Sequence, residues 1–394
     1  MRTAIRRGAA AAGAVVLSVL GLTTGAQAAP AEADVLSVAG AEVVPDSYVV
    51  VLKSGKVART VAAEHDATVL HTYKRVFNGF AATMSARQAR QVAADPDVAF
   101  VQPDVIHRIS ATQTNPPSYG LDRIDQRNRP LNQAYTYSTA AANVHAYIID
   151  TGIRTTHGDF GGRATSGFDA VDGGAADDCN GHGTHVAGTV GGSAHGVAKG
   201  VQLVAVRVLN CEGSGTTAQV AAGIEWVTAN AAKPAVANMS LGGGADTALD
   251  NAVRASIDSG VSYAIAAGNG LFGIFALDAC TQSPARVSTA ITVSATNSSD
   301  AKPSWANRGT CVDVFAPGIS ITSTWSTSDS ATNTISGTSM ATPHVAGAAA
   351  LYLAGHPGDT PAQVHSAIVS NATTGVVTSP GSGSPNRLLY TGAF

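Results

Sequence analysis

Charged residues are scarce in this chain. They make up 13% of its 394 residues, the formal net charge is −3, and no long basic run is present. Because proteins that bind nucleic acid present concentrated basic charge, we exclude that class of partner. The 45% of hydrophobic residues and the 42 glycines instead predict a compact fold with a well-buried core, not a disordered or fibrous chain.

Long apolar stretches are also rare. The one at residues 9–22 follows three arginines and precedes the motif AQA, which ends at Ala28. It is shorter than the roughly 20 residues that cross a bilayer, and small-x-small motifs mark signal-peptide cleavage. We therefore predict a secretory signal peptide over 1–28, not a membrane anchor. We expect a secreted, extracellular protein with no membrane partner, in an oxidising space where cysteine pairs persist.

Cysteine is too sparse for a disulfide scaffold. The four cysteines suffice for two bridges, and the residues alone leave all three pairings open. A zinc site is the rival interpretation, but the spacing lacks CxxC and secretion disfavours it. The residues concerned are Cys179, Cys211, Cys280 and Cys311.

Residues 47–107 are predicted to form a small α+β unit. Strand and helix patterns follow one another in the order strand, helix, strand, strand, helix, strand, which is that of a ferredoxin-like module. The polar, proline-containing segment 110–119 suits a linker to the rest of the chain. The expected strands are 47–52, 67–73, 79–84 and 98–107, and the expected helices are 56–64 and 85–94.

The remaining two thirds of the chain alternates short apolar runs with helical stretches. Such alternation predicts an α/β domain with a doubly wound parallel sheet, in which ligands bind at the carboxyl ends of the strands. The expected buried strands are 144–149, 201–208, 236–241, 261–267, 290–295 and 312–315, and the clearest helices are 217–230 and 247–259.

Three polar segments stand out in this region. Asp150 ends a strand in AYIIDTG, His182 and His185 lie in the glycine-rich NGHGTHVAG, and Ser339 begins an alanine-rich helix in SGTSMATPHVAG. Taken singly, each is ordinary, because such residues serve as turn residues, surface residues or helix caps. Together they supply a carboxylate, a base and a hydroxyl. The spacing does not choose between the two histidines.

A nucleophilic serine fits the position of Ser339. A serine hydroxyl needs an adjacent base, and at a helix N-terminus the unpaired N–H groups and the helix dipole favour developing negative charge. Asn269, which follows the strand AIAA and a glycine, offers a side-chain amide as a second oxyanion donor. Gly268 is expected to let a substrate backbone approach closely.

These motifs resemble the signature segments of the subtilases, the subtilisin-like serine endopeptidases. AYIIDTG, NGHGTHVAGT and GTSMATPHVAG follow the chain order Asp, His, Ser that is known for subtilisin. The surrounding strings GLDRIDQR, ANMSLGGG and GSPNRLLY are similar to the proteinase K and aqualysin branch. The resemblance implies a three-layer subtilisin-like domain over 111–394, preceded by an inhibitory propeptide over 29–110.

The resemblance also implies a role for single residues. Asp150 would be the orienting acid, His182 the general base, Ser339 the nucleophile and Asn269 the oxyanion donor. Protein or peptide substrates would bind as an added strand, the enzyme would be monomeric, and no catalytic metal or organic cofactor is expected. The substrate-binding residues implied are Gly213, Ser214, Gly215, Ser240, Leu241, Gly242, Ala266, Ala267 and Gly268.

Disulfides and structural calcium follow from the same resemblance. It pairs Cys179 with Cys211 and Cys280 with Cys311. Carboxylates and carbonyls are the ligands that Ca²⁺ requires. One implied site holds Asp122, Asp125 and Gln126, although Asn132 stands where relatives carry an aspartate. A second holds Asp313 with the carbonyls of Ser288 and Ala290. A third, weaker candidate is the acidic loop with Asp169, Asp172, Asp177 and Asp178.

The propeptide and one loop complete the predictions. The tail 105–110 would lie in the cleft, with self-cleavage near Ser110–Ala111; a permanent accessory domain is the alternative.

The loop GLFGIFALDAC at 270–280 is longer and more apolar than is usual in the family. The uncharged pocket segment 266–269 favours apolar or aromatic residues at P1, the substrate residue whose carbonyl is attacked. A lipase, which requires G-x-S-x-G, and a silent binding protein are the competing function classes.

Overall fold

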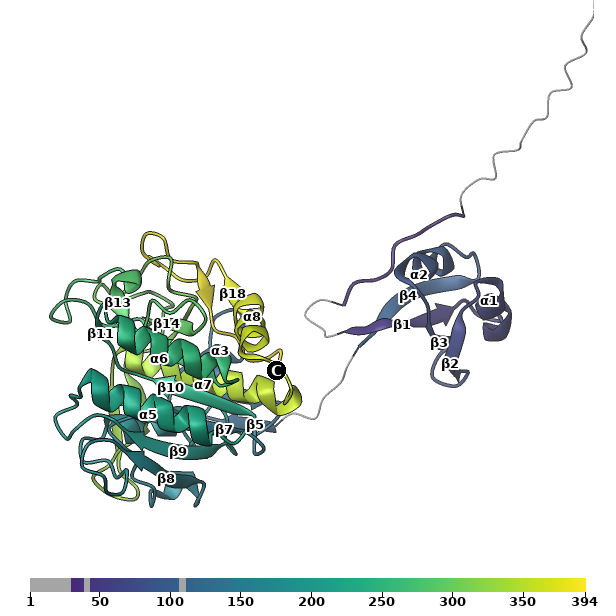
Figure 1. Cartoon of the computed structure of the whole chain (residues 1–394). Coiled ribbons are helices and arrows are strands. Elements are labelled where there is room, and N and C mark those ends of the chain that lie inside the picture. The colour runs from purple at the N-terminus through teal and green to yellow at the C-terminus, as the bar shows by residue number, and fades with distance from the viewer. Residues whose placement is uncertain (1–29, 39–42, 106–110) are drawn as a thin grey trace, which may run out of the picture. The chain divides into compact units, whose positions relative to one another are not determined.

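The computed structural model describes residues 30–38, 43–105 and 111–394, and the chain divides into two compact units at residue 106 (Figure 1). The predicted signal peptide with its cleavage site, and most of the propeptide tail, lie outside the described residues. In the described part, no helix is both long enough and apolar enough to cross a membrane.

The N-terminal unit is a four-stranded antiparallel sheet with two helices. Its strand order β2-β3-β1-β4 and its element order confirm the predicted ferredoxin-like module. Val50, Phe80 and Val101 form the centre of its core. Ser85 and Gln88 close a reciprocal capping box at the second helix. The elements are β1 (Val43–Leu52), α1 (Ala58–Glu64), β2 (Thr68–Tyr73), β3 (Gly79–Thr83), α2 (Ala86–Ala93) and β4 (Val98–Val105).

The C-terminal unit is built on a nine-stranded sheet. All neighbouring strands pair in parallel except β18 and β19, which are antiparallel. The six predicted strands are its centre; the edge strands β8, β18 and β19 were not predicted, because they are short or interrupted by polar residues and glycine. The order is β18 (Thr373–Thr374), β19 (Arg387–Leu388), β15 (Val314–Pro317), β14 (Ile291–Thr296), β12 (Ser262–Ala266), β10 (Ala235–Met239), β7 (His145–Asp150), β9 (Gln202–Arg207) and β8 (Ala164–Asp169).

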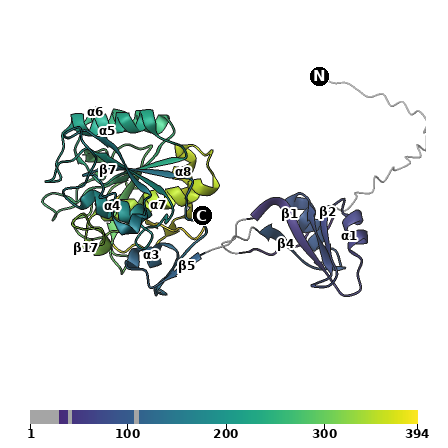
Figure 2. The same ribbon diagram turned by 90° about the horizontal axis from the view of Figure 1, so that it is seen from below.

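Helices cover both faces of this sheet, so the predicted three-layer architecture is confirmed (Figure 2). One apolar cluster joins the sheet to α4 (His182–Gly191) and α7 (Thr338–Gly355), and another joins it to α5 (Thr217–Asn230) and α6 (Thr247–Asp258). The helix α8 (Pro361–Asn371) packs on α7.

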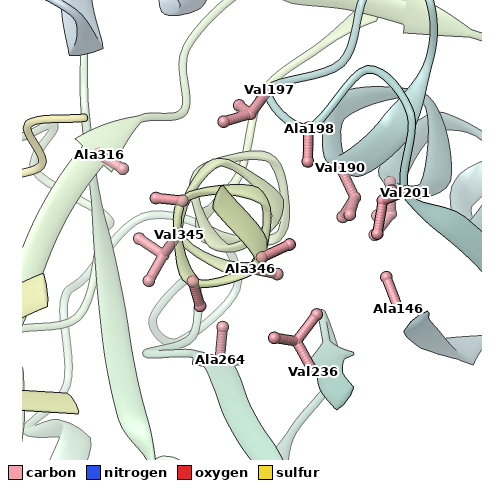
Figure 3. Close-up of a cluster of buried hydrophobic side chains, with 14 of the residues drawn as sticks. Ala146, Val190, Val197, Ala198, Val201, Val236, Ala264, Ala316, Val345 and Ala346 are labelled. Atoms are coloured by element: carbon pink, nitrogen blue, oxygen red, sulfur yellow. The ribbon is translucent and has the colours of Figure 1, made fainter. Parts of the chain in front are cut away.

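The alanine-rich helix α7 is the centre of the larger core. Figure 3 shows Val345 and Ala346 of this helix among apolar side chains of the sheet and of the segment that follows α4. Small side chains allow close packing here, since a Cβ added at Gly347 would lie 2.6 Å from the Cβ of Val197. The start of α7 is thereby fixed against the sheet.

The order in which successive strands are added to the sheet reverses beside β7. From this strand the sheet continues to β9 and β8 on one side, and to β10, β12, β14 and β15 on the other. The carboxyl ends of β7 and β10 therefore flank a switch point, where a crevice forms in open α/β sheets. Asp150 ends β7 and Ser240 follows β10.

The predicted linker 110–119 is wrong over most of its length. Ala111–Thr114 forms β5 and pairs with β6 (Ala134–Tyr137), and the Ser118 hydroxyl caps α3 (Tyr119–Ile124). Polar side chains suit the exposed face of this two-stranded ribbon, while Tyr135 of β6 is completely buried in the core. The smaller remaining elements are β11 (Gly243–Gly244), β13 (Gln282–Ser283), β16 (Ile321–Thr324), β17 (Thr332–Ile335), η1 (Gly158–Phe160) and η2 (Ala279–Thr281).

Candidate active site

Asp150 and His182 meet at the carboxyl edge of the sheet. The Nδ1 atom of His182 lies 2.7 Å from Oδ1 of Asp150, whose side chain is fully buried. The same oxygen accepts the Thr151 N–H at 2.8 Å. His182 is the first residue of α4. The N-cap residue Gly181 has φ 111° and no room for a side chain, because a Cβ would lie 2.4 Å from the Trp325 ring.

This contact sets the protonation state of the imidazole. Because the carboxylate accepts a hydrogen bond from Nδ1–H, Nε2 is the unprotonated nitrogen and can receive a proton. Burial disfavours the imidazolium, but the charge and hydrogen bond of Asp150, together with the charge of Asp178, outweigh it and raise the pKa of His182. The ring is a quarter exposed, so its free edge can be reached from the cleft.

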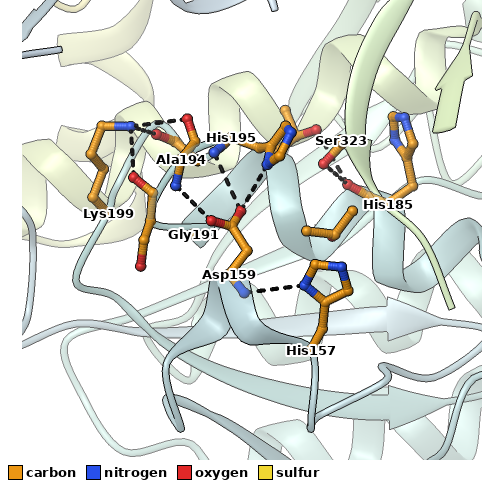
Figure 4. Close-up of polar contacts among 12 residues, drawn as sticks. His157, Asp159, His185, Gly191, Ala194, His195, Lys199 and Ser323 are labelled. Atoms are coloured by element: carbon orange, nitrogen blue, oxygen red, sulfur yellow. Dashed lines mark hydrogen bonds and ion pairs between the residues drawn. The ribbon is translucent and has the colours of Figure 1, made fainter. Parts of the chain in front are cut away.

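His185 has a different environment. It is completely buried, and its Nε2 atom donates to the carbonyl of Ile321 at 3.0 Å. Burial lowers its pKa to about 4, so the ring stays neutral. Its own carbonyl accepts the Ser323 hydroxyl (Figure 4). The structure thus supplies a physical reason, absent from the sequence spacing, to prefer His182 as a base.

The segment after α4 is held by a buried carboxylate. Asp159 accepts the Ala194 N–H at 2.7 Å and the Nδ1–H of His195 at 2.9 Å, as Figure 4 shows. Burial alone would raise the pKa of Asp159, but these hydrogen bonds lower it below its usual value. The carboxylate stays ionised and fixes the chain that leaves the helix of His182.

Ser339 stands in the first turn of α7, where backbone N–H groups have no partner within the helix. Its hydroxyl donates to the carbonyl of Ser240 at 3.2 Å, and the Ser240 hydroxyl donates to the carbonyl of Ser339 at 2.8 Å. The two residues thus join the start of α7 to the end of β10.

Asn269 follows β12 and faces the same helix start. Its Oδ1 atom accepts both the N–H and the hydroxyl of Thr338, at 2.8 and 2.9 Å. The Nδ2 group is therefore the end left to donate. A Cβ added at Gly337 would lie 3.5 Å from Nδ2, so this donor borders the N-terminus of α7.

The structure gives a packing reason for Gly268 in addition to the one expected from the sequence. Gly268 has φ 99°, and an added Cβ would lie 2.6 Å from the Nδ2 atom of Asn307. Asn307 is buried and also donates to the carbonyl of Ala267 at 2.7 Å. The glycine is therefore required by this packed amide, and the structure does not require a substrate backbone to explain it.

Two hollows open at this edge of the sheet. One, of about 620 Å³, is lined by His182 and by the stretches 213–215 and 240–244. The other, of about 370 Å³, is lined by Ser339, the stretch 266–270 and again 240–243, and none of its lining residues is charged. They adjoin along the shared stretch, so the structure brings the predicted catalytic and substrate-binding residues to one cleft.

The comparisons with known proteins agree with this geometry. Residues 142–388 match the model of the subtilase family, and residues 41–110 match that of peptidase inhibitor I9. The chain belongs to the subtilase family. As a subtilase it is a serine endopeptidase, and an I9 inhibitor region precedes the catalytic domain.

Its relatives include proteases from several bacteria. The chain is 55% identical over 334 residues to the extracellular serine proteinase of Thermus sp. (strain Rt41A), covering 84% of this chain and 80% of that one. It is 54% identical over 320 residues to alkaline serine exoprotease A of Vibrio alginolyticus, covering 79% of this chain and 58% of that one. The crystal structure of a cold adapted subtilisin-like serine proteinase matches with TM-score 0.67 and 55% identity, covering 69% of this chain and 97% of that one.

Both implied disulfides are present in this subtilase. Cys179 is bonded to Cys211 and Cys280 to Cys311. The first joins the loop before α4 to the loop after β9, where Asn180 also donates to the Cys211 carbonyl at 2.8 Å. The chain-entropy model gives each bridge roughly 3–4 kcal/mol of stabilisation.

The residues of the first implied calcium site fit a cation. Asp125 Oδ1 is buried without a hydrogen-bond partner, while its other oxygen accepts the Thr136 N–H at 2.6 Å. Asp122 accepts the N–H groups of Asn132 and Gln133. Within the described residues no three His, Cys, Asp or Glu side chains gather as a metal cluster, so a cation would also need carbonyl ligands.

The other two implied sites fit less well. The Asp313 oxygen Oδ1 lies 3.3 Å from Nε2 of His365, and Oδ2 accepts the Thr292 N–H. In the acidic loop, Arg207 pairs with both Asp169 and Asp172, at 2.8 and 2.9 Å, and offsets part of their negative charge. A guanidinium already stands where the third site would need its cation.

Two supporting residues were missed by the sequence analysis. Thr338 fixes the Asn269 amide, and Asn307 packs behind Gly268. Thr338 lies inside the motif GTSMATPHVAG and could have been considered there. Asn307, in WANRG, has no local pattern that sets it apart.

Proposed function

We propose that this subtilase is a secreted, broad-specificity endopeptidase that hydrolyses peptide bonds through an acyl-enzyme on Ser339. The observation that carries the proposal is the 2.7 Å contact between the buried Asp150 carboxylate and His182 Nδ1. It leaves Nε2 as a base at the edge of the cleft that Ser339 lines. Asp150, His182 and Ser339 are the proposed catalytic residues.

The proposed acylation step uses these residues in turn. The Ser339 hydroxyl leaves the Ser240 carbonyl by rotation about χ1, and its proton passes to His182 Nε2 while Oγ bonds to the substrate carbonyl carbon. The resulting oxyanion accepts hydrogen bonds from the Ser339 N–H and from Asn269 Nδ2. The imidazolium then gives its proton to the departing amine, the C–N bond breaks, and an ester remains on Ser339.

Deacylation repeats the same transfers with water. His182 takes a proton from a water molecule, whose oxygen bonds to the ester carbonyl carbon, and the same two donors hold the oxyanion. The proton on His182 returns to Ser339 as the C–O bond breaks. Asp150 keeps its charge throughout and stabilises the imidazolium at each stage.

Substrate is proposed to bind as an extended strand between two backbone edges, 213–215 and 240–242, by main-chain hydrogen bonds. The P1 side chain would enter the uncharged hollow of about 370 Å³ next to Ser339. Because no lining residue there could pair with a Lys or Arg side chain, we propose a preference for apolar or aromatic P1 residues.

The chain is proposed to be a self-processing zymogen. Residues 1–28 would be the signal peptide and 29–110 an inhibitory propeptide, with cleavage near Ser110–Ala111. The I9 match and the separate compact N-terminal unit support this organisation. Ser339→Ala should accumulate the uncleaved chain. Normal processing of that variant would instead favour a permanent accessory domain cut by another protease.

A structural calcium ion is proposed at Asp122, Asp125 and Gln126. When bound, the ion would neutralise the two carboxylates and supply a partner for the buried Oδ1 of Asp125. Asp313, with the carbonyls of Ser288 and Ala290, is a second candidate that would first have to displace His365. Neither site touches the reacting atoms, so the ion's role would be stability.

The overall proposal is tested with casein and a serine-directed phosphonylating reagent. We expect casein cleavage that stops when Ser339 alone is labelled. Ester turnover without peptide-bond cleavage would instead indicate a lipase-type hydrolase. Neither activity, in a folded and processed protein, would indicate a catalytically silent binding protein.

A further inference from the structure

The exposed large apolar side chains of the catalytic unit lie together. Among its described residues, all four such side chains belong to Leu271, Phe272, Ile274 and Phe275. Phe272 is 83% exposed and Phe275 66%. Soluble proteins seldom gather exposed apolar side chains at one place without a binding role. We name the segment 271–275 the apolar hairpin.

The apolar hairpin has a three-residue loop, 272–274, which contains a β-turn with Phe272 and Gly273 at its centre. Leu271 and Phe275 pair in antiparallel fashion, with the Leu271 N–H donating to the Phe275 carbonyl at 2.8 Å and the Ile274 N–H donating to the Leu271 carbonyl at 3.1 Å. Phe272 and Gly273 both have positive φ, 54° and 67°. Asn-Gly is the usual pair in such a turn, and a bulky residue at positive φ is strained. A phenylalanine is thus kept at the tip although asparagine would suit the backbone better.

Both ends of the hairpin are fixed to the active-site cleft. Gly270 lines the P1 hollow beside Asn269, and it has no room for a side chain because a Cβ would lie 2.2 Å from the Phe275 carbonyl oxygen. On the far side, the Leu277 N–H donates to the buried Asn307 at 2.7 Å. The disulfide of Cys280 closes the loop soon after. The apolar side chains are therefore presented from a preorganised base.

We infer that the apolar hairpin is an extra wall of the substrate cleft, which binds apolar side chains of a polypeptide substrate next to its P1 residue. This inference rests on the proposed peptidase function and deepens it. The hairpin starts one residue after the rim of the P1 hollow, so a chain held at Ser339 passes close to it. Contact with Phe272 and Phe275 then removes apolar surface from water on both partners.

The charge of the segment favours a polypeptide over a lipid surface. From 268 to 280 the only charged residue is the acid Asp278, and no lysine or arginine accompanies the phenylalanines. Segments that bind membrane surfaces combine apolar side chains with basic ones, which pair with anionic head groups. An uncharged apolar hairpin at the rim of a peptide-binding hollow matches a protein substrate better.

The test compares two double variants of the self-processed enzyme made from the full chain. F272N/F275S removes the two phenylalanine rings, the most exposed apolar side chains of the hairpin, while giving the turn its preferred Asn-Gly pair, and F272L/F275L keeps both positions apolar. The substrates are peptides with Phe at P1, each carrying Leu or Ser at one position from P3 to P3′. We measure the Leu/Ser ratio of kcat/KM at every position, together with the thermal midpoint of each enzyme.

We expect a ratio of about tenfold at one or more positions near P1 in the parent enzyme, as for burial of a medium-sized apolar side chain. It should be retained in F272L/F275L and fall to near one in F272N/F275S. If F272N/F275S is unstable, F272N alone should show a partial fall. Equal ratios in all enzymes would overturn the inference.

Two further outcomes separate the possible failures. In the first, the parent enzyme sediments with phosphatidylcholine vesicles, F272N/F275S does not, and the peptide ratios are equal in all enzymes. This result would overturn the inference in favour of a lipid partner. Equal ratios in an enzyme still inactivated by labelling at Ser339 would overturn the hairpin's role alone. Turnover that survives labelling of Ser339 would overturn the proposed function, and the inference with it.

Discussion

Ser240 and Ser339 hold each other by two reciprocal hydrogen bonds, each hydroxyl donating to the other residue's carbonyl. Ser240 directly follows β10, and Ser339 lies in the first turn of α7. The pair therefore fixes a proposed substrate edge to the proposed nucleophile. It also gives the Ser339 hydroxyl a resting partner other than His182.

Removal of the Ser240 hydroxyl should weaken this junction. We expect Ser240→Ala to lower kcat by up to about tenfold and to destabilise the fold by about 1–3 kcal/mol, because the hydroxyl also accepts a hydrogen bond from the buried Asn238 amide. Peptide kinetics and thermal unfolding check both values. Ser328→Ala, at an exposed serine, is the matched control and should change neither. Unchanged kcat in Ser240→Ala would show that the junction does not position Ser339.

The oxyanion role of Asn269 predicts a loss confined to the chemical step. Asn269→Asp keeps an oxygen for Thr338 to donate to but lacks the Nδ2 donor, so kcat should fall about 10²- to 10³-fold with little change in KM. Thr338→Val removes one of the two hydrogen bonds that hold Asn269 Oδ1 and should therefore lose less. Initial rates over a range of substrate concentrations give kcat and KM for both variants. A rise in KM at constant kcat would assign Asn269 to ground-state binding instead.

The raised pKa of His182 predicts an acid limit on activity. Only the neutral imidazole can accept the Ser339 proton, so kcat/KM should fall as the pH drops through this pKa. Because Asp150 raises the pKa, the midpoint should lie above the ordinary value near 6.5. Asp150→Asn should move it down and cost about 10⁴ in kcat. A midpoint that stays in place in Asp150→Asn would argue that another group titrates.

A buried ion pair predicts a large stability effect away from the cleft. Arg123 binds Asp300 through two hydrogen bonds at 2.7 and 3.2 Å, and both side chains are almost inaccessible. Arg123→Ala leaves an unpaired buried carboxylate and should cost about 3–5 kcal/mol. Arg154→Ala, which breaks the exposed pair with Asp329, should cost much less. Denaturant unfolding of phosphonylated enzyme, which cannot digest itself, compares the two.

The calcium proposal predicts a thermal shift that depends on Asp125. Chelation should lower the thermal midpoint of the parent enzyme by a few degrees, as expected for loss of about 1–2 kcal/mol in a domain of this size. Asp125→Asn should have a lower thermal midpoint even without chelator, and adding chelator should change that midpoint little. Asp172→Asn, at a carboxylate that already pairs with Arg207, is the control and should keep the calcium response. A full response in Asp125→Asn would place the ion elsewhere.

The sequence predicts the centre of the fold because its signal is local. The strands β7, β10, β12 and β14 are short segments rich in apolar and small residues and buried on both faces, and such segments are recognisable without tertiary information. The strand β8 contains Ser166 and Gly167, and β18 and β19 have two residues each, so their pairing is decided by neighbours far away in the chain.

The candidate site is likewise predictable from the sequence only in part. Asp150 and Ser339 stand at a strand end and a helix start, places that the pattern identifies. The choice of His182 over His185 needs the position of Asp150 in space, or the family resemblance. Neither the sequence pattern nor the family resemblance identifies Asn307, because only the packed structure shows that its amide lies behind Gly268.

The central claim is that Ser339 forms an acyl-enzyme with the help of His182. Rapid mixing of the processed enzyme with a p-nitrophenyl peptide ester, acid quenching and mass analysis test it directly. We predict a burst of about one equivalent of nitrophenol and a peptidyl ester on Ser339, with the burst lost in His182→Ala. A normal burst in Ser339→Ala, or an acyl group found on another residue, would contradict the account.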